Sequence, residues 1–417
     1  MVFMMASNAA QPFAATEKWL TIVGIGEDGV AGLGPTAQEL IARAEHVFGG
    51  ARHLALAQPL VRGTAHAWPV PFDASFRAVL ALRGQAVCVL ASGDPFLHGV
   101  GASLVRHVPP AEMRVLPAPS SFSLAAARLG WALQAVETVS LHGKPIELIL
   151  PLLHPGRRIL ALTSDGHAPA AIAALLTEAG FGASPFIICE ALGGVDAAIH
   201  ESHANRLGTA VFHPLNIVAI TVATDVAARI LPRAPGLDDA LFAHDGQITK
   251  REVRALTLSA LQPRRGELLW DIGAGAGSVA IEWMLTDASL KAIAVENNTE
   301  RAGRIGANAL RLGVPGLRVV TGAAPAALAG LPQPDAIFVG GGGTDDGVMP
   351  AAMAALPAGG RLVANGVTLE MEALLLHLYQ QHGGHLTQIA IARAAPLGGM
   401  SGWRPAMPVT QWQWTKP

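Results

Sequence analysis

The sequence has little charge of either sign and few residues that could hold a metal. Only 14% of its 417 residues are charged and 51% are hydrophobic, which is too apolar a composition for a disordered protein. Lys and Arg number 29 against 31 for Asp and Glu, so the basic excess of a general nucleic-acid binder is missing. No apolar run reaches 18 residues without Gly, Pro, His or a charge, which argues against a transmembrane helix and a membrane partner.

Cysteine and export signals are equally scarce. The two cysteines, Cys88 and Cys189, lie in apolar runs and form no C-x-x-C pair, so we expect two buried thiols. The 15 histidines show no H-E-x-x-H spacing, and we predict no metal site. Residues 1–17 lack the basic and apolar regions of a signal peptide. We therefore expect a loose tail there and a cytoplasmic protein.

The first half alternates apolar runs with turns rich in Gly and Pro. A strand from Trp19 leads into a Gly-rich turn and a helix that begins near Pro35. Further strand ends follow at residues 46–50, 86–94 and 113–120, and this alternation favours a mostly parallel sheet. A second group of strands is predicted at residues 137–143, 157–165, 184–192 and 216–223. Residues 231–247 contain two prolines and no periodicity, and we interpret them as a linker.

The second half repeats the alternation more regularly and predicts a doubly wound α/β domain. Helices are predicted at residues 256–261, 278–285 and 300–313. Strands are predicted at residues 266–272, 291–296, 317–322, 334–341 and 360–366. We divide the chain into a tail (1–17), a first domain (18–235) and a second domain (236–417).

The strand before residue 273 ends in a turn with a distinctive glycine spacing. Asp271 precedes Gly273, Gly275 and Gly277, and a helix follows at once. A dinucleotide site would have its third glycine at position 278, which is Ser278, so the spacing indicates a ligand without phosphates. Glu296 ends the next strand, where a carboxylate can accept hydrogen bonds from ribose hydroxyls. A nucleoside with a cationic tail, such as S-adenosylmethionine, fits this turn.

Three turns in the first half lie at predicted strand ends, where ligands bind in open sheets. Gly24, Gly26 and Gly29 match G-x-G-x-x-G, but the helix starts late and no acid follows residues 46–50, which argues against a nicotinamide site. Residues 92–95 (Ser-Gly-Asp-Pro) form the second turn. Ser120 and Ser121 form the third, at a helix start that they can cap.

These motifs carry a family resemblance that covers residues 19–410. The first half resembles the tetrapyrrole (corrin) methyltransferases in VGIGEDG, LASGDPFLHG, PAPSSFSLAAARLGW and SLHGKP, although Lys144 stands where the family often has Arg. The second half resembles the decarboxylating class I corrin methyltransferases in GQITKREVRALTLSAL, DIGAGAGSVAIEW, GAAPAAL, AIFVGGGG and LVANGVTLE. The fusion of both halves in this order is similar to the bifunctional methyltransferases of aerobic cobalamin synthesis.

The resemblance implies a fold and an activity. The fold would be a two-lobed tetrapyrrole methylase domain followed by a class I, Rossmann-like methyltransferase domain. The first domain would methylate carbon 5 of precorrin-6B, and the second would methylate carbon 15 and remove the carboxylate of the acetate at ring carbon 12, giving precorrin-8. Each domain would bind its own S-adenosylmethionine. We also expect a homo-oligomer and transient contacts with neighbouring cobalamin-pathway enzymes.

The resemblance also assigns cofactor contacts to the Gly-rich turns. In the first domain these are Gly24, Gly26, Gly93, Asp94, Pro95, Ser120 and Ser121. In the second domain they are Asp271, Gly273, Gly275, Gly277, Glu296, Ala323 and Ala324. The family often has Asp where this chain has Ala323, so we expect adenine to contact the backbone or another group there.

The substrate carries many carboxylates, so its sites need cations and backbone N–H groups. In the second domain we expect Thr249 and Lys250 to line the site, with Asn365 as a further catalytic candidate. Thr249 and Glu252 have the spacing of a capping box, and Lys250 and Arg254 that of one helix face. Gly341 and Gly342 would let a flat macrocycle approach the backbone. His98, His142 and Lys144 are the candidates for substrate binding in the first domain.

Four other functions remain open at this point. A class I methyltransferase of another small molecule could use the first half only to capture substrate, although the Ser-Gly-Asp-Pro turn argues against this. A nicotinamide-dependent dehydrogenase would need the acid missing after residues 46–50. A non-catalytic S-adenosylmethionine sensor would show no turnover on a corrinoid. A nucleic-acid methyltransferase would bind RNA with a strong salt dependence.

Overall fold

A computed structural model describes residues 18–68 and 74–417, which divide into two compact units. One unit contains the chain up to Lys144 together with Pro155–Ala228, and the other contains Pro145–His154 and Arg229–Pro417. The predicted tail at residues 1–17 lies outside the described residues. Within the described ranges, none of the helices combines the length and apolar character needed to cross a membrane.

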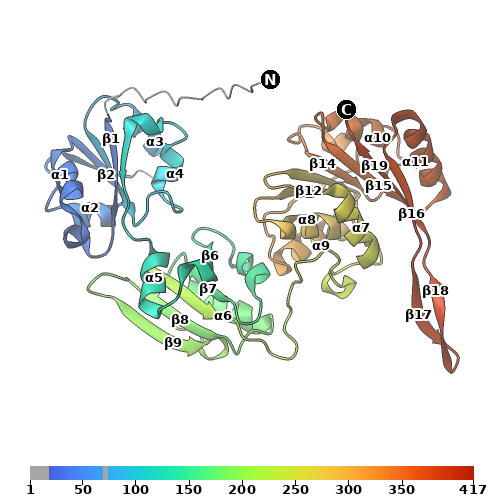
Figure 1. The fold of residues 1–417 in the computed structure, drawn as a ribbon, viewed down its shortest axis with the longest axis horizontal. Coiled ribbons are helices and arrows are strands. Elements are labelled where there is room, and N and C mark those ends of the chain that lie inside the picture. Colours follow the sequence, from blue (N-terminus) through green and yellow to red (C-terminus); the bar gives the residue numbers. More distant parts are fainter. Residues whose placement is uncertain (1–17, 69–73) are drawn as a thin grey trace, which may run out of the picture. The chain divides into compact units, whose positions relative to one another are not determined.

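The first lobe of the first unit is a parallel sheet flanked by helices (Figure 1). Its strand order is β3-β2-β4-β1-β5, and every described pairing is parallel, which confirms the predicted sheet. The strands are β1 (Leu20–Ile25), β2 (His46–Gly49), β3 (Thr64–Ala67), β4 (Val87–Ser92) and β5 (Met113–Leu116). The helices are α1 (Pro35–Arg43), α2 (Ala51–Ala57), α3 (Ala74–Leu80) and α4 (Val100–Leu104). β1 is buried along its whole length, as expected for a continuous apolar run in the centre of a parallel sheet.

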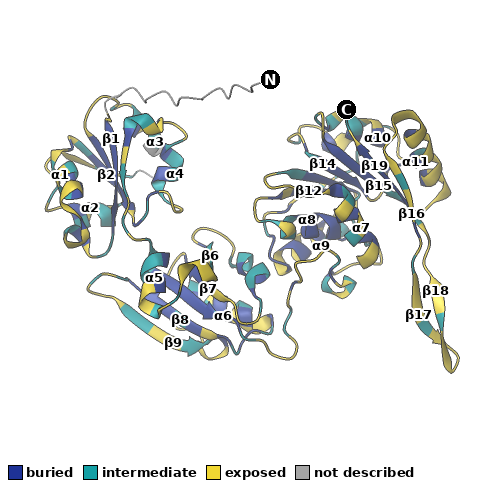
Figure 2. Cartoon of the chain, viewed as in Figure 1, coloured by how far each residue is buried: buried dark blue, intermediate teal, exposed yellow. Residues whose placement is uncertain are grey.

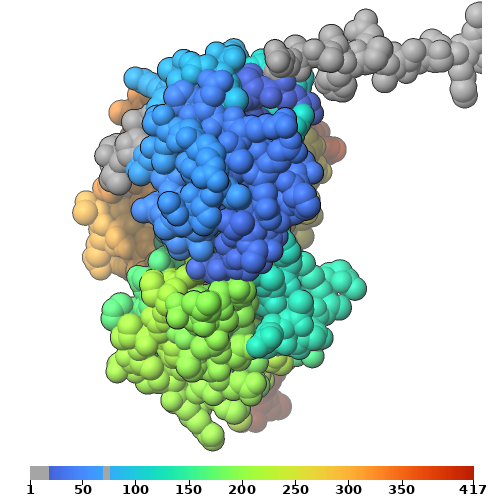
Figure 3. Space-filling model, turned by 90° about the vertical axis from the view of Figure 1, so that its left-hand side faces the viewer, coloured from blue at the N-terminus to red at the C-terminus, as the bar shows by residue number. Residues whose placement is uncertain are grey.

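The second lobe of this unit is a mixed sheet, and Figure 3 shows it in green below the blue first lobe. Its order is β6-β7-β10-β8-β9, and only the β6–β7 pair is parallel. The elements are α5 (Ser121–Leu129), β6 (Val136–Ser140), β7 (Arg158–Leu162), α6 (Ala168–Glu178), β8 (Pro185–Glu190), β9 (Ala198–His203) and β10 (Asn216–Thr221). The four predicted strands are present. The edge strand β9 was not predicted, because four of the six residues of its sequence AIHESH are polar and none of the six is buried.

The second unit is built on a seven-stranded sheet with the order β13-β12-β11-β14-β15-β19-β16. The five predicted strands are present and parallel: β11 (Leu268–Ile272), β12 (Lys291–Glu296), β13 (Arg318–Thr321), β14 (Ala336–Val339) and β15 (Arg361–Gly366). Two unpredicted antiparallel strands extend the sheet, β16 (His385–Ile389) and β19 (Val409–Thr415). The helices are α7 (Arg251–Leu261), α8 (Ser278–Thr286), α9 (Thr299–Arg311), α10 (Val348–Ala355) and α11 (Leu369–His382).

A two-stranded hairpin interrupts the chain between β16 and β19. It consists of β17 (Ala392–Leu397) and β18 (Met400–Pro405), which pair with each other as a separate sheet. The strands of the larger sheets are mostly buried, whereas the hairpin is largely exposed (Figure 2). Leu397, Met400 and Trp403 are among its exposed apolar residues.

The segment predicted as a linker is packed against the second domain. Leu231, Leu237 and Phe242 are buried in the same core cluster as Leu258 and Trp283. The interpretation of residues 231–247 as a linker is therefore wrong. The sequence does not reveal this packing, because the buried side chains are spaced too irregularly to show a helical or strand period.

The predicted cap of helix α7 is also wrong. The helix begins at Arg251, its N-cap residue is Lys250, and no side chain caps it. Thr249 lies one residue too early to form the predicted box, and Glu252 instead pairs with Arg393.

Candidate active sites

The Gly-rich turn of the second domain has the backbone that its glycines predict. Gly273, Gly275 and Gly277 have φ values of 68°, 59° and 74°, a region that other residues rarely adopt. A Cβ on Gly273 would lie 2.5 Å from the carbonyl oxygen of Gly341. The turn after β11 therefore packs directly on the glycine segment after β14, at the carboxyl edge of the parallel strands.

Glu296 is held against this turn by two backbone N–H groups. Its carboxylate accepts hydrogen bonds from the N–H of Gly275 (2.8 Å) and from that of Asn298 (3.1 Å). The residue is only 4% exposed, yet it lines the cavity beside the turn. Glu296 therefore lies beside the Gly-rich turn at the cavity, and its role in binding a cofactor stays a prediction.

Asp271 lies below the turn rather than in the site. Its side chain is buried, accepts a hydrogen bond from the N–H of Ala280 (3.1 Å), and leaves Oδ1 without a partner among the described residues. Burial is the main cause that raises the pKa of Asp271 to about 7, and the charge of Glu296 adds to the effect. Neither Asp271 nor Gly277 lines the cavity, which corrects their prediction as direct cofactor contacts.

A cavity of about 620 Å³ opens at this edge of the sheet. Ten of the predicted site residues line it: Thr249, Lys250, Gly273, Gly275, Glu296, Ala323, Ala324, Gly341, Gly342 and Asn365. Sequence reasoning missed the wall that comes from the base of the hairpin, which consists of Ile389, Ile391, Arg393, Ala406, Met407 and Val409. The pairing of β16 with β19 brings these residues to the site, and no local sequence motif predicts that pairing.

Asn365 is oriented by two buried polar residues. Its Nδ2 donates to the hydroxyl of Thr257 (2.9 Å), and its Oδ1 accepts a hydrogen bond from Nε2 of Gln411 (2.9 Å). Gln411 also donates to the Thr257 hydroxyl (3.2 Å), and it faces Asn365 across the β15–β19 pair. Sequence reasoning missed both residues. Gln411 lies in none of the quoted motifs, and Thr257 lies within GQITKREVRALTLSAL but was not singled out.

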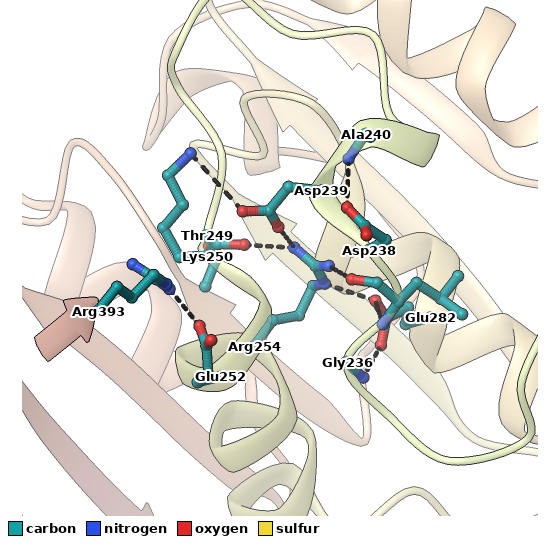
Figure 4. A network of polar contacts seen from close by, with 11 residues as sticks. Gly236, Asp238, Asp239, Ala240, Thr249, Lys250, Glu252, Arg254, Glu282 and Arg393 are labelled. Carbon is teal, nitrogen blue, oxygen red and sulfur yellow. Dashed lines mark hydrogen bonds and ion pairs between the residues drawn. The ribbon is translucent and has the colours of Figure 1, made fainter. Parts of the chain in front are cut away.

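Arg254 does not line the cavity, which corrects its prediction as a substrate contact. Its side chain is fully buried, its Nε donates to Glu282 (2.5 Å), and one of its terminal nitrogens pairs with Asp239 (3.1 Å) (Figure 4). The same guanidinium donates to the backbone carbonyls of Leu237 and Thr249. Arg254 therefore fastens two loops to α7, and one of these loops carries Thr249 and Lys250.

The three predicted turns of the first domain meet at the carboxyl ends of β1, β4 and β5. A Cβ on Gly24 would lie 1.9 Å from the carbonyl oxygen of Gly93 and 2.6 Å from the N–H nitrogen of Ala118, so only glycine fits there. Ser120 caps α5 by accepting a hydrogen bond from the N–H of Ser123 (3.1 Å), as predicted.

The other predicted residues of this domain lie in both lobes, and His142 lies in the second one, after β6. Asp94 accepts a hydrogen bond from the N–H of Phe96 (2.8 Å), and the His142 ring lies 3.1 Å from the carbonyl oxygen of Thr163. Burial, and secondarily the charge of Lys144, lowers the pKa of His98. Gly26 and Pro95 lie in the first and second turns, and Ser121 begins α5.

Sequence reasoning missed a polar cluster at the same edge of the first sheet. The Ser92 hydroxyl at the end of β4 lies 2.8 Å from both the Arg52 guanidinium and Nε2 of His53, at the start of α2. Burial, followed by the charge of Arg52, lowers the pKa of His53 to about 4. Arg52 also pairs with Glu27 in the loop after β1. The position of these residues directly after strand ends was the signal that could have identified them.

Comparison with known protein families gives one match for each half of the chain. Residues 19–207 match the family of tetrapyrrole (corrin/porphyrin) methylases, and residues 240–416 match the precorrin methyltransferase domain. The fold and the sites together define an S-adenosylmethionine-dependent methyltransferase made of two fused methylase domains.

Full-length relatives identify the family. The chain is 62% identical over 412 residues to the precorrin-6Y C(5,15)-methyltransferase [decarboxylating] of Sinorhizobium sp, a match that covers 99% of this chain and all of the relative. It is 41% identical over 400 residues to the protein of the same name from Mycobacterium tuberculosis strain CDC 1551, covering 95% of this chain and all of that protein. The chain belongs to the family of decarboxylating precorrin-6Y C(5,15)-methyltransferases.

Among solved structures, one that is similar to this chain covers less than half of it. The C-terminal domain of the precorrin-6Y C5,15-methyltransferase from Rhodobacter capsulatus is 50% identical to this chain, with a TM-score of 0.43. The match covers 45% of this chain and all of that domain.

Proposed function

We propose that the chain methylates precorrin-6Y at carbons 5 and 15 and decarboxylates it at the acetate of ring carbon 12. The second domain acts at carbon 15 and carries out the decarboxylation, and the first domain acts at carbon 5. The observation that carries this proposal is the cavity of the second domain, which is lined by the Gly-rich turn, by the carboxylate of Glu296 and by basic side chains suited to an acidic substrate. A cytoplasmic location, a homo-oligomer and contacts with pathway enzymes remain predictions.

Each domain binds one S-adenosylmethionine in this proposal. In the second domain, Glu296 would accept hydrogen bonds from the ribose hydroxyls, and the backbone of Gly273 and Gly275 would lie against the cofactor. Ala323 and Ala324 line the cavity with small apolar side chains, so polar contacts with adenine would come from the backbone. When bound, S-adenosylmethionine supplies a methyl group on a positively charged sulfur.

The residues of the cavity mainly orient the substrate and exclude water. Gly341 and Gly342 allow a flat ring to approach the backbone, and Asn365 presents an amide whose orientation is set by its buried partners. Orientation of this kind can contribute several kcal/mol to the lowering of a barrier, about 7 to 11 in the best cases. Loss of the substrate's carboxylate as carbon dioxide leaves an electron pair, which the conjugated macrocycle can accept.

The product mass tests this proposal. In an anaerobic incubation with precorrin-6Y and S-adenosylmethionine, we expect a gain of two methyl groups and a loss of one carbon dioxide. Gly275→Arg should abolish methylation at carbon 15 and decarboxylation but leave methylation at carbon 5, because its Cβ would lie 2.9 Å from the carbonyl oxygen of Gln247. Asp94→Arg should abolish methylation at carbon 5 and leave methylation at carbon 15 and the decarboxylation. No change in mass with an active substrate preparation would refute the proposal.

A further inference from the structure

The cavity of the second domain has two cations on one side, contributed by distant parts of the chain. Lys250 precedes α7, and Arg393 lies on β17 of the hairpin (Figure 4). Both residues line the cavity. Their acidic partners, Asp239 and Glu252, do not line it, so the two positive charges face the cavity with the acids outside its lining.

Lys250 has most of its hydrogen-bonding capacity free. Its Nζ lies 3.7 Å from the Asp239 carboxylate, which is an ion pair but too long for a hydrogen bond. The other oxygen of Asp239 is held by the buried Arg254 at 3.1 Å. No hydrogen bond from the Lys250 side chain is recorded within residues 18–68 and 74–417, and 47% of that side chain is exposed.

Arg393 is similarly available to a ligand. One terminal nitrogen donates to Glu252, and its other N–H groups have no recorded partner among the described residues. Because both side chains of the pair are nearly half exposed, the pair contributes little to stability and can be exchanged for a ligand carboxylate at small cost.

Arg301, the third basic residue that lines the cavity, already has an acidic partner. Arg301 donates to the Asp245 carboxylate at 2.8 Å, and a second arginine, Arg304, lies 3.5 Å from the same carboxylate. Arg301 lies in the first turn of α9, five residues after Glu296, at the end of the cavity where the ribose is proposed to bind. Lys250 and Arg393 are therefore the cations best placed for the substrate.

We propose that Lys250 and Arg393 form a clamp for one peripheral carboxylate of the tetrapyrrole. This inference rests on the proposed function and adds the group of the substrate that is recognised and the residues that recognise it. The planar guanidinium can bind both oxygens of a carboxylate, and the ammonium adds a point charge from the opposite element. A substrate without that carboxylate would lose affinity for the second domain only.

The hairpin offers a matched control for the test. Arg404 is the cross-strand partner of Arg393, is exposed, and does not line the cavity. Arg393→Gln should raise the KM for precorrin-6Y in the carbon-15 reaction at least tenfold, whereas Arg404→Gln should change it less than twofold. Methylation at carbon 5 by the same chain should be unaffected in both variants.

A binding measurement separates the clamp from a general disturbance of the site. We would titrate the full chain with uroporphyrin, a tetrapyrrole with eight carboxylates, and follow its fluorescence. Arg393→Gln and Lys250→Gln should each weaken binding at least fivefold while the affinity for S-adenosylmethionine, measured by calorimetry, stays within twofold of wild type.

The outcomes distinguish this proposal from the function on which it rests. If the wild-type chain converts precorrin-6Y but Arg393→Gln behaves like Arg404→Gln, the clamp is refuted and the function stands. An equal loss of affinity for S-adenosylmethionine would also refute the clamp, since Arg393 would then be shaping the whole cavity. If the wild-type chain does not convert precorrin-6Y, the proposed function itself fails.

Discussion

Replacing Arg254 with methionine removes the centre of a buried polar network. The guanidinium has no exposed surface and bonds Glu282, Asp239 and the backbone carbonyls of Leu237 and Thr249. Methionine fills a similar volume but provides no donor. The variant therefore leaves both carbonyls and a buried carboxylate without their main partner.

The expected loss in the free energy of unfolding depends on which hydrogen bonds Glu282 keeps. This carboxylate is 4% exposed and would retain only the N–H groups of Gly236 (2.6 Å) and Leu237 (2.9 Å). Removing one partner of a buried ion pair costs about 3–5 kcal/mol, because the other charge stays buried. Adding Glu282→Gln removes that charge, so the double variant should be less destabilised than the sum of the two single variants.

Hydrogen exchange followed by mass spectrometry is the suitable assay. The chain has two units, so a single unfolding transition is not expected, and local protection is the better measure. Peptides from residues 251–311 should lose about two to four orders of magnitude of protection, which corresponds to 3–5 kcal/mol. Peptides from residues 18–68 should not change. A loss below tenfold, or an equal loss in both units, would refute the reasoning.

Three further predictions follow from other sites. Gly24→Ala should lower methylation at carbon 5 at least tenfold, whereas Gly34→Ala should not, because a Cβ at Gly34 meets nothing within 4 Å. Gln411→Leu should lower kcat of the carbon-15 reaction about tenfold by releasing the amide of Asn365, without changing the affinity for S-adenosylmethionine. The pKa of Asp271 is raised from 3.8 to about 7, so its stabilising contribution is fully present below pH 3.8 and lost as the pH rises to about 7. Hydrogen exchange in peptides of the second unit, corrected for the intrinsic pH dependence of exchange, should therefore show a loss of stability from pH 5 to pH 8 in the wild type that is absent in Asp271→Asn.

Each of these predictions has a clear contrary result. Equal rates of methylation at carbon 5 in Gly24→Ala and Gly34→Ala would mean that the end of β1 tolerates a Cβ at position 24. A normal kcat in Gln411→Leu would show that Asn365 needs no orientation or has no role. A wild type and an Asp271→Asn variant with the same pH dependence would mean that this carboxyl titrates normally.

Most central strands of the sheets were predicted from the sequence, whereas the edge strands β3, β9 and β16 and the strands β17, β18 and β19 were not. Strands such as β1 and β11 are buried apolar runs that end in a Gly-rich turn, a pattern that depends only on neighbouring residues. The strands after residue 384 were not predicted. β18 contains both Gly402 and Pro405, so its local signal is weak. β19 has the sequence VTQWQWT, whose alternation of glutamine and tryptophan is typical of a strand and was overlooked.

The candidate sites show the same limit. The glycine turn, Glu296 and the cap at Ser120 follow from short motifs, and the structure places them as expected. Arg254 was wrongly predicted to contact the substrate, because it lies four residues after Lys250 and both were assigned to one exposed helix face. In the structure, α7 begins only after Lys250. Gln411 and Arg393 could not be found, since only long-range pairing of strands brings Gln411 against Asn365 and Arg393 to the cavity.

The hydrogen bond between Glu296 and the N–H of Gly275 has a consequence for affinity. A free glycine-rich loop loses much conformational entropy when a ligand orders it, and that loss weakens binding. Here the loop is already ordered by a carboxylate that is itself fixed by Asn298. The entropic cost is thus met during folding, where the packing of the whole domain offsets it, and the ligand encounters a preorganised site.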